Sequence, residues 1–133
     1  MNAAEYNQRL VAQVRRIREA EHDYGKAIDT WAEAERLYKL GESKAFAMIY
    51  EYKNADDRRA KVEVAQVNLD EVDQPITVNT LRYLAHLAEA RMNACKLAVQ
   101  NRASELSALQ SGASLSRAEA EFTKWAPEEA VGT

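Results

Sequence analysis

The sequence has few of the residues that interrupt helices or cross-link chains. Its 133 residues include 4 glycines, 2 prolines and a single cysteine, Cys95. Scarce turn-forming residues favour a few long helices, and one cysteine cannot form an intramolecular disulfide, which suits a reducing compartment. The chain also lacks an apolar run near the ~18 residues of a membrane span, and the N-terminal MNAAEYNQRL has no apolar signal core. We therefore expect a cytoplasmic protein with no membrane segment.

A strong net charge and catalytic motifs are missing as well. The net charge is −3, so binding to nucleic acid would need a local basic patch. The sequence has no glycine-rich phosphate loop and no pair of Cys or His residues with metal-ligand spacing. His22 and His86 stand singly on separate predicted helices, and Cys95 lies on an apolar helix side. We therefore predict no enzymatic activity, no catalytic residue, no metal and no cofactor.

What the sequence does contain is long helical patterns. Gly41 can end one helix and Ser43 can cap the next, while Pro75 disfavours a continuing helix. Ser116 and Glu119 form a capping box after SGAS. The prediction is a single all-α domain over residues 1–133, with helices at about 3–40, 43–68, 79–110 and 117–126, a linker at 69–78 and a flexible tail at 127–133. The long amphipathic helices are expected to form a helical hairpin or three-helix coiled coil, with a short C-terminal helix.

Two of these helices carry an apolar stripe with steps of four and three residues, which places the side chains on one side of a helix. In the first, Gly25 costs roughly 1 kcal/mol relative to Ala in a helix interior, so a break near Gly25 stays open. Its stripe consists of Leu10, Val14, Ile17, Glu21, Tyr24, Ile28, Trp31, Glu35 and Tyr38. The stripe of the helix at 79–110 consists of Leu81, Leu84, Ala88, Met92, Cys95, Val99, Ala103, Leu106 and Leu109.

The segment KVEVAQV, at residues 61–67, alternates in the manner of a strand. An isolated strand needs a partner, and the sequence offers no evident one. We therefore keep this segment in the helix predicted at 43–68.

Slender helices leave aromatic side chains that one chain cannot cover. A helix of about 35 residues is ~50 Å long, so three of them make a thin bundle. Self-association buries the remaining aromatic surface. We therefore expect a homo-oligomer with an interface at Tyr24, Ile28, Trp31 and Tyr38.

The stretch YEYKNADDRRAK, at residues 50–61, has two possible interpretations. Aromatic rings between Lys and Arg can stack the bases of single-stranded nucleic acid. The same residues can form a solvent-facing helix, because Asp56 could pair with Arg59 and Asp57 with Lys61. These pairs would balance part of the cationic run, and Arg58 has no acid four residues away. Both interpretations stay open.

Residues 36–110 also follow a recognisable order. An aromatic-rich segment, KAFAMIYEY, precedes the charged DDRRAKVEVAQVNLDEVDQ, and a long amphipathic helix with a central cysteine follows, LRYLAHLAEARMNACKLAVQNRASEL. This layout resembles that of the T4-type phage recombination mediators (UvsY-like proteins) and of related small helical phage proteins. The resemblance implies a homo-oligomer that binds single-stranded DNA and helps to load a recombinase against a single-strand-binding protein. For a phage protein, the compartment would be the host cytoplasm.

The resemblance also bears on where DNA would be contacted. That family is rich in Lys and Arg just before its tyrosines, whereas this chain has Lys44 there and Lys53 after them. The expected contacts therefore shift toward the cations that follow. The predicted nucleic-acid-binding residues are Lys44, Tyr50, Tyr52, Lys53, Arg58, Arg59 and Lys61.

Two functions are compatible with these features. The first is a non-enzymatic recombination mediator or single-stranded DNA-binding accessory protein, in which an oligomer repeats a modest basic patch. The alternative is a helical adaptor, or a phage-encoded inhibitor of a host protein, that binds a protein through its apolar stripe without nucleic acid.

Overall fold

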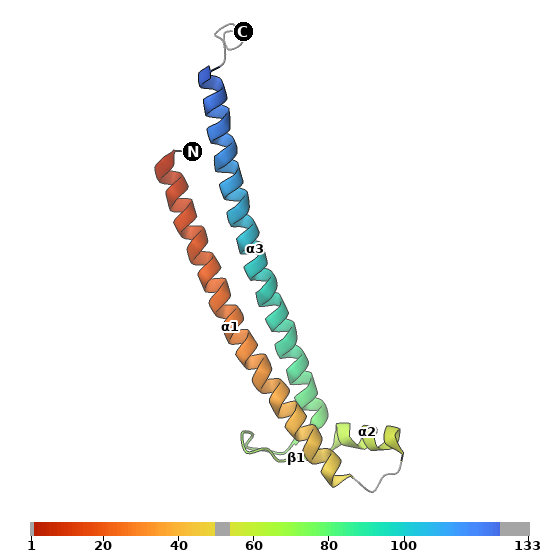
Figure 1. The fold of residues 1–133 in the computed structure, drawn as a ribbon. Coiled ribbons are helices and arrows are strands. Elements are labelled where there is room, and N and C mark those ends of the chain that lie inside the picture. Colours follow the sequence, from red (N-terminus) through yellow and green to blue (C-terminus); the bar gives the residue numbers. More distant parts are fainter. Residues whose placement is uncertain (1, 50–53, 126–133) are drawn as a thin grey trace. The chain divides into compact units, whose positions relative to one another are not determined.

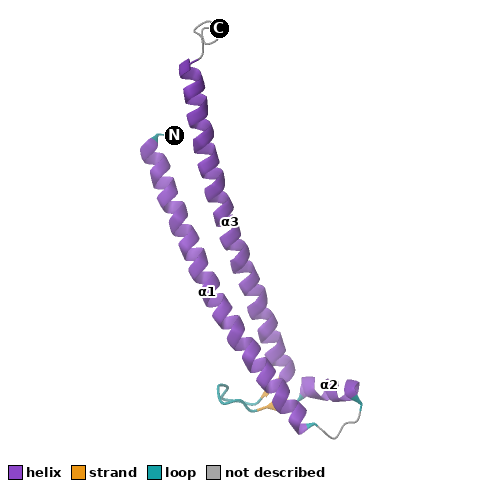
Figure 2. Cartoon of the chain, viewed as in Figure 1, coloured by secondary structure: helices purple, strands orange, loops and turns teal. Residues whose placement is uncertain are grey.

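The computed structural model describes residues 2–49 and 54–125, with side-chain environments up to residue 113. Its elements are α1 (Ala3–Met48), α2 (Ala55–Val64), β1 (Gln66–Val67), β2 (Ile76–Thr77) and α3 (Val78–Trp125) (Figure 1). Helices make up nearly all of the regular structure, as Figure 2 shows, so the prediction of an all-α protein is confirmed. Within the described residues, no helix is both long and apolar enough to cross a membrane.

The chain divides into two compact units. One is Asp23–Lys96, and the other combines Met1–His22 with Leu97–Thr133. Both long helices pass through both units, and within each unit α1 packs against α3 in the antiparallel direction (Figure 1). The smaller elements α2, β1 and β2 belong to Asp23–Lys96.

Small as well as large side chains form the seam between α1 and α3. Five large members of the predicted α1 stripe are half-buried, namely Leu10, Ile17, Tyr24, Trp31 and Tyr38. At the places expected for Val14, Glu21 and Ile28, the residues that are buried or half-buried are instead Gln13, Ala20 and Ala27. The expectation that Val14 and Ile28 lie in this seam is wrong, since each is 37% exposed. Small residues between two helices let the backbones approach closely, which leaves bulkier neighbours at the edge. The α1 seam consists of Tyr6, Leu10, Gln13, Ile17, Ala20, Tyr24, Ala27, Trp31, Ala34, Tyr38, Gly41 and Ala45.

The facing stripe of α3 follows the prediction closely. Ala85, which is buried, stands in place of Leu84, and Arg102 stands in place of Ala103. The remaining members are half-buried or buried as expected, namely Leu81, Ala88, Met92, Cys95, Val99, Leu106 and Leu109.

Neither Gly25 nor Gly41 interrupts α1, so the predicted helix end at residue 40 is wrong. Among the described residues no glycine has a positive φ, and Gly41 is therefore not a left-handed cap. Its role is close packing: a Cβ at Gly41 would lie 2.5 Å from the Leu81 Cδ1 atom and 3.4 Å from the Val67 Cγ2 atom. Residues 43–48, expected to open a second helix, continue α1 instead.

The helix predicted at 43–68 is also too long at its other end. α2 starts after Asn54, whose side chain accepts a hydrogen bond from the Asp56 backbone N at 2.9 Å, and it ends at Val64, before the extended residue Ala65. The strand-like alternation of residues 61–67 corresponds to a strand only in the last two residues, Gln66 and Val67. They form β1, which pairs antiparallel with β2 so that Val67 lies opposite Ile76. The partner strand lies inside the predicted linker at 69–78.

The helices predicted at 79–110 and 117–126 are one helix, α3, which runs through SGAS to Trp125. A single glycine costs a helix only about 1 kcal/mol, so Gly112 does not suffice to end it. Residues 127–133, the predicted tail, lie outside the described residues.

A small apolar core occupies the unit Asp23–Lys96. Strand β1 and the loop between β1 and β2 contribute Val67 and Leu69, which are both buried. The other buried members come from the three helices, namely Ala45, Val62, Val78 and Leu81. This core joins the end of α1 and the start of α3 to α2.

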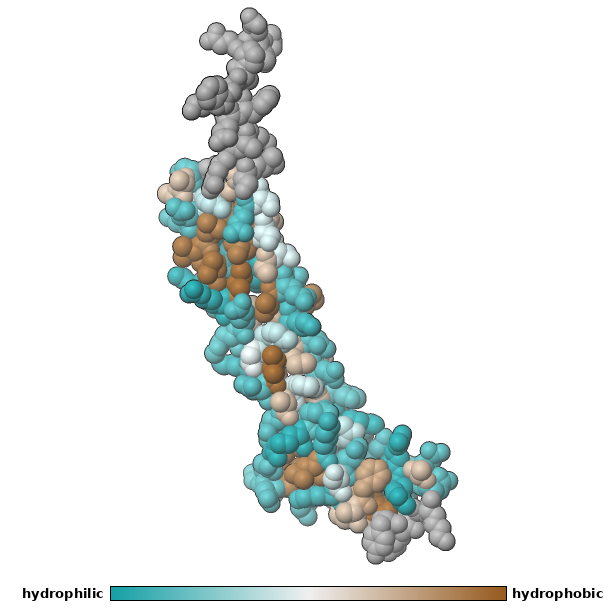
Figure 3. Space-filling view, viewed as in Figure 1, coloured by the Kyte–Doolittle hydropathy of each residue, from teal (hydrophilic) through white to brown (hydrophobic). Residues whose placement is uncertain are grey.

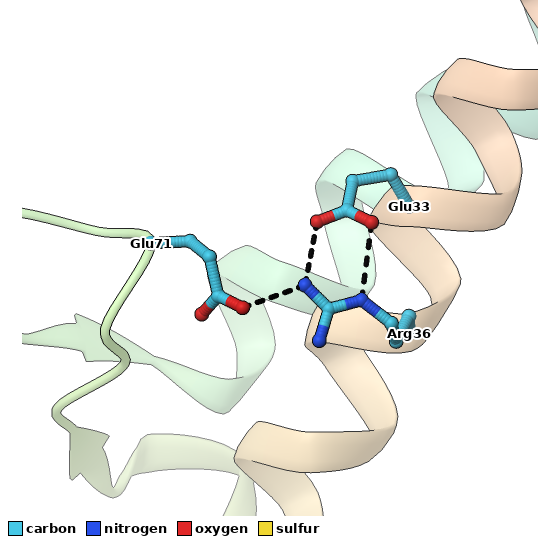
Figure 4. Close-up of polar contacts among 3 residues, drawn as sticks. All are labelled: Glu33, Arg36 and Glu71. Carbon is cyan, nitrogen blue, oxygen red and sulfur yellow. Dashed lines mark hydrogen bonds and ion pairs between the residues drawn. The ribbon is translucent and has the colours of Figure 1, made fainter.

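A forked ion pair fastens the loop between the strands to α1. The Arg36 Nη2 atom lies 2.6 Å from a Glu33 carboxylate oxygen and 2.7 Å from the Glu71 Oε1 atom, and Arg36 Nε donates to Glu33 at 3.0 Å (Figure 4). These hydrogen bonds lower the pKa of both carboxyls below the ordinary value. The loop is thus held by charge as well as by its apolar residues.

Candidate functional site

The predicted nucleic-acid residues fall into three groups. Lys44 lies on α1, where its Nζ atom donates to the Asn68 carbonyl oxygen at 2.9 Å. Tyr50, Tyr52 and Lys53 lie outside the described residues. The cations of α2 form the third group.

On α2, Arg59 and Lys61 are exposed, whereas Arg58 is half-buried and interacts with another group. The expected pairs of Asp56 with Arg59 and of Asp57 with Lys61 do not form. Neither cation makes an ion pair with any residue in the described ranges. Exposed ion pairs gain little free energy, so spacing alone does not ensure them. The two acids instead occupy the first turn of α2, where the helix dipole favours negative charge.

Arg59 and Lys61 are two positions apart on α2, so they point to different sides of the helix. Arg59, together with Val62 and Glu63, lines a pocket of about 370 Å³. Lys61 does not line it. The two exposed cations of α2 are therefore chemically similar but differently placed.

Three helices supply the walls of this pocket, which lies wholly within Asp23–Lys96. Val62 and Val78, each 2% exposed, belong to the core beneath it, and Phe46 is 38% exposed. The members from α1 follow one another at steps of four residues and so share a helix face. The lining residues are Tyr38, Glu42, Phe46, Arg59, Val62, Glu63, Val78, Asn79 and Arg82.

Some polar groups of the pocket form hydrogen bonds or ion pairs with one another. Arg82 lies 2.8 Å from the Glu63 Oε1 atom and donates to the Asn79 Oδ1 atom at 2.9 Å. The Tyr38 hydroxyl donates to one oxygen of Glu42, Oε2, at 3.1 Å. Burial first, and then this hydrogen bond, raise the pKa of the Tyr38 hydroxyl. Arg59 and the second oxygen of Glu42 remain available to a ligand.

The predicted interface residues have different surroundings. Tyr24 and Trp31 are half-buried at the seam with α3, and Tyr38 packs against the core. Ile28 lies at the edge of the seam. Much of this aromatic surface is thus covered within the chain.

Sequence reasoning missed most of the pocket. The four-residue spacing of Tyr38, Glu42 and Phe46 was a usable signal, but it crosses Gly41, where the first helix was expected to end. Glu63 and Arg82 come together only through tertiary packing. Across the described residues, no group of three or more His, Cys, Asp or Glu side chains is placed to hold a metal ion.

Comparison with known proteins adds no relative to this picture. No protein-family model, curated protein or solved structure matches the chain.

Proposed function

We propose that the protein is a non-enzymatic accessory protein that binds single-stranded DNA through α2 and acts as a homo-oligomer. The observation that carries the proposal is the state of Arg59 and Lys61. Both are exposed, and neither is neutralised by a described acid although Asp56 and Asp57 are close in sequence. Cations in this state are available to phosphate groups.

A single copy offers few such cations, and the chain as a whole is acidic. An oligomer that repeats α2 would sum weak phosphate contacts along one strand, which raises the overall affinity. The resemblance to recombination mediators suggests that the protein helps to load a recombinase against a single-strand-binding protein, and we include this role in the proposal.

The test is binding of single-stranded oligonucleotides at low and moderate salt. The parent protein should bind, with an affinity that falls steeply as salt rises, because phosphate contacts release counterions. The double variant Arg59→Glu/Lys61→Glu should lose binding. Arg9→Glu/Lys26→Glu is the matched control, because it makes the same charge change at exposed positions of α1.

Circular dichroism should show unchanged helicity in both double variants. Absence of binding by the parent at low salt would refute the proposal. Equal loss in both double variants would mean that net charge, rather than α2, governs binding.

A second candidate function is a protein-binding adaptor. The observation in its favour is exposed apolar surface, which Figure 3 shows among polar residues. On α3, Tyr83 is 62% exposed and Leu87 is 49% exposed. Both lie opposite the seam, since a shift of two residues from Leu81 or Ala85 turns a helix by about 200°. This surface suits a partner protein or another copy of the chain.

A further inference from the structure

We infer that the pocket between α1, α2 and α3 receives one base of the bound strand, with a preference for bases that carry an exocyclic amino group. This inference rests on the proposed single-stranded DNA binding and adds to it the place where a base is held. It assigns different tasks to the two exposed cations of α2.

The size and walls of the pocket suit a flat ring. Its volume of about 370 Å³ lies within the range of ~300–1,000 Å³ that is usual for small-ligand sites. Phe46 presents an exposed aromatic ring at the pocket, while Val62 and Val78 close its apolar side. Proteins that bind single strands stack bases on aromatic rings of this kind.

The free polar groups of the pocket suit the edge of a base and the phosphate beside it. Glu42 uses Oε2 to accept from Tyr38, which leaves Oε1 to accept from an amino group such as that of cytosine. Arg82 and Glu63 form an ion pair, so together they add no net charge to the pocket. Arg59 remains as the cation for a neighbouring phosphate.

Glu42 also gives the pocket a basis for discrimination. Thymine has no exocyclic amino group and would leave the Glu42 oxygen without its donor, whereas cytosine supplies one. A strand of deoxycytidines should therefore bind more tightly than a strand of thymidines of equal length. The number of phosphates, and hence the counterion effect, is the same in both.

The experiment compares three labelled strands of equal length: deoxycytidine, thymidine and an abasic strand that keeps the phosphates but lacks bases. Phe46→Ala should weaken deoxycytidine binding by about 5- to 150-fold, the range for loss of one stacked base, and should leave abasic binding unchanged. Glu42→Leu, which removes both acceptor oxygens, should remove the preference for deoxycytidine over thymidine. Phe46→Leu, which keeps apolar packing, should behave as Phe46→Ala does and guards against an effect of unfolding.

Two matched controls stand on α2. Val64→Ala changes an apolar side chain that is exposed and does not line the pocket, so it should bind all strands as the parent does. Lys61→Gln should weaken binding of all three strands alike and reduce the salt slope by about 1, since phosphate contacts carry no sequence information.

The outcomes separate the inference from the function on which it rests. Salt-dependent binding of all three strands with equal affinity, or a Phe46→Leu variant that binds deoxycytidine as the parent does, would overturn the base pocket and leave the proposed function standing. Failure of the parent to bind any strand at low salt would overturn both.

Discussion

Gly41 and Gly25 occupy the same helix but differ in what surrounds them. A Cβ at Gly41 would meet the buried side chain of Leu81, whereas a Cβ at Gly25 would meet nothing within 4 Å. We expect Gly41→Ala to lower the free energy of unfolding by about 1–2 kcal/mol, because overpacking outweighs the gain in helix propensity. Gly25→Ala should raise it by about 0.5–1 kcal/mol. Urea denaturation of both variants tests these two predictions. Changes of the same sign in the free energy of unfolding would contradict them.

Also at the scale of single residues, the Arg36 fork predicts how stability depends on pH. Its hydrogen bond to Glu71 lowers the pKa of that carboxyl below the ordinary 4.5. A carboxyl with the lower pKa in the folded state adds stability above its ordinary pKa and loses it as pH falls through the folded value. The free energy of unfolding should therefore decline in acid below about pH 4.5. Glu71→Gln should decline less over the same range, and an identical decline would contradict the assignment.

At the scale of elements, α2 depends on its N-terminal cap. The Asn54 side chain accepts from the Asp56 backbone N, which satisfies one otherwise unpaired donor of the first turn. Asn54→Ala should cost about 1 kcal/mol of stability, and Asn54→Asp, which keeps an acceptor oxygen, should cost little. Thermal unfolding of the two variants is the measurement. An Asn54→Ala protein as stable as the Asp variant would show that the cap contributes nothing.

The elements also show how far sequence reasoning reaches in this chain. Seven of the nine residues expected in the α3 stripe are buried or half-buried, because a regular apolar period leaves a long helix only one side to pack. The ends of the helices were harder to predict from the sequence. Glycine is a residue type typical of helix ends, which is why a helix end was predicted at Gly41. In the structure, the absence of a side chain at Gly41 instead makes room for Leu81, and this long-range contact is visible only in the folded chain.

The strand pair was missed, and residues 61–67 were assigned to a helix, for a related reason. A two-residue strand such as β1 is defined by its partner, and β2 lies in a segment that sequence alone marked as a linker. In the site, the helical spacing of Asp56 and Arg59 permitted an ion pair without making one favourable. Long-range pairings and weak surface contacts were thus the parts that the sequence could not determine.

At the scale of the whole molecule, the outer side of α3 is where we expect copies to associate. Tyr83, Leu87, Ala90 and Ala94 recur at steps of four and three and are all exposed. Tyr83→Lys/Leu87→Lys should therefore reduce the mass measured by light scattering toward the 15.0 kDa of one chain, with helicity retained.

Val64→Lys, at an exposed position of α2, is the control and should keep the parent mass. A parent protein of 15.0 kDa at micromolar concentration would contradict self-association. A double variant of unchanged mass would instead place the interface on another face.

The polar contact of Gln13 has a bearing on the order in which the chain folds. Its side chain is 7% exposed and donates to the Arg102 carbonyl oxygen at 2.8 Å, across 89 positions of sequence. Closing so long a loop costs more chain entropy than pairing β1 with β2, whose residues are near neighbours in sequence. We therefore expect folding to nucleate around the strand pair and α2. Pairing of α1 with α3 should then extend toward the chain ends, so that the hydrogen bond from Gln13 to Arg102 forms late. Backbone amides near Gln13 should then exchange with solvent sooner than those near Gly41.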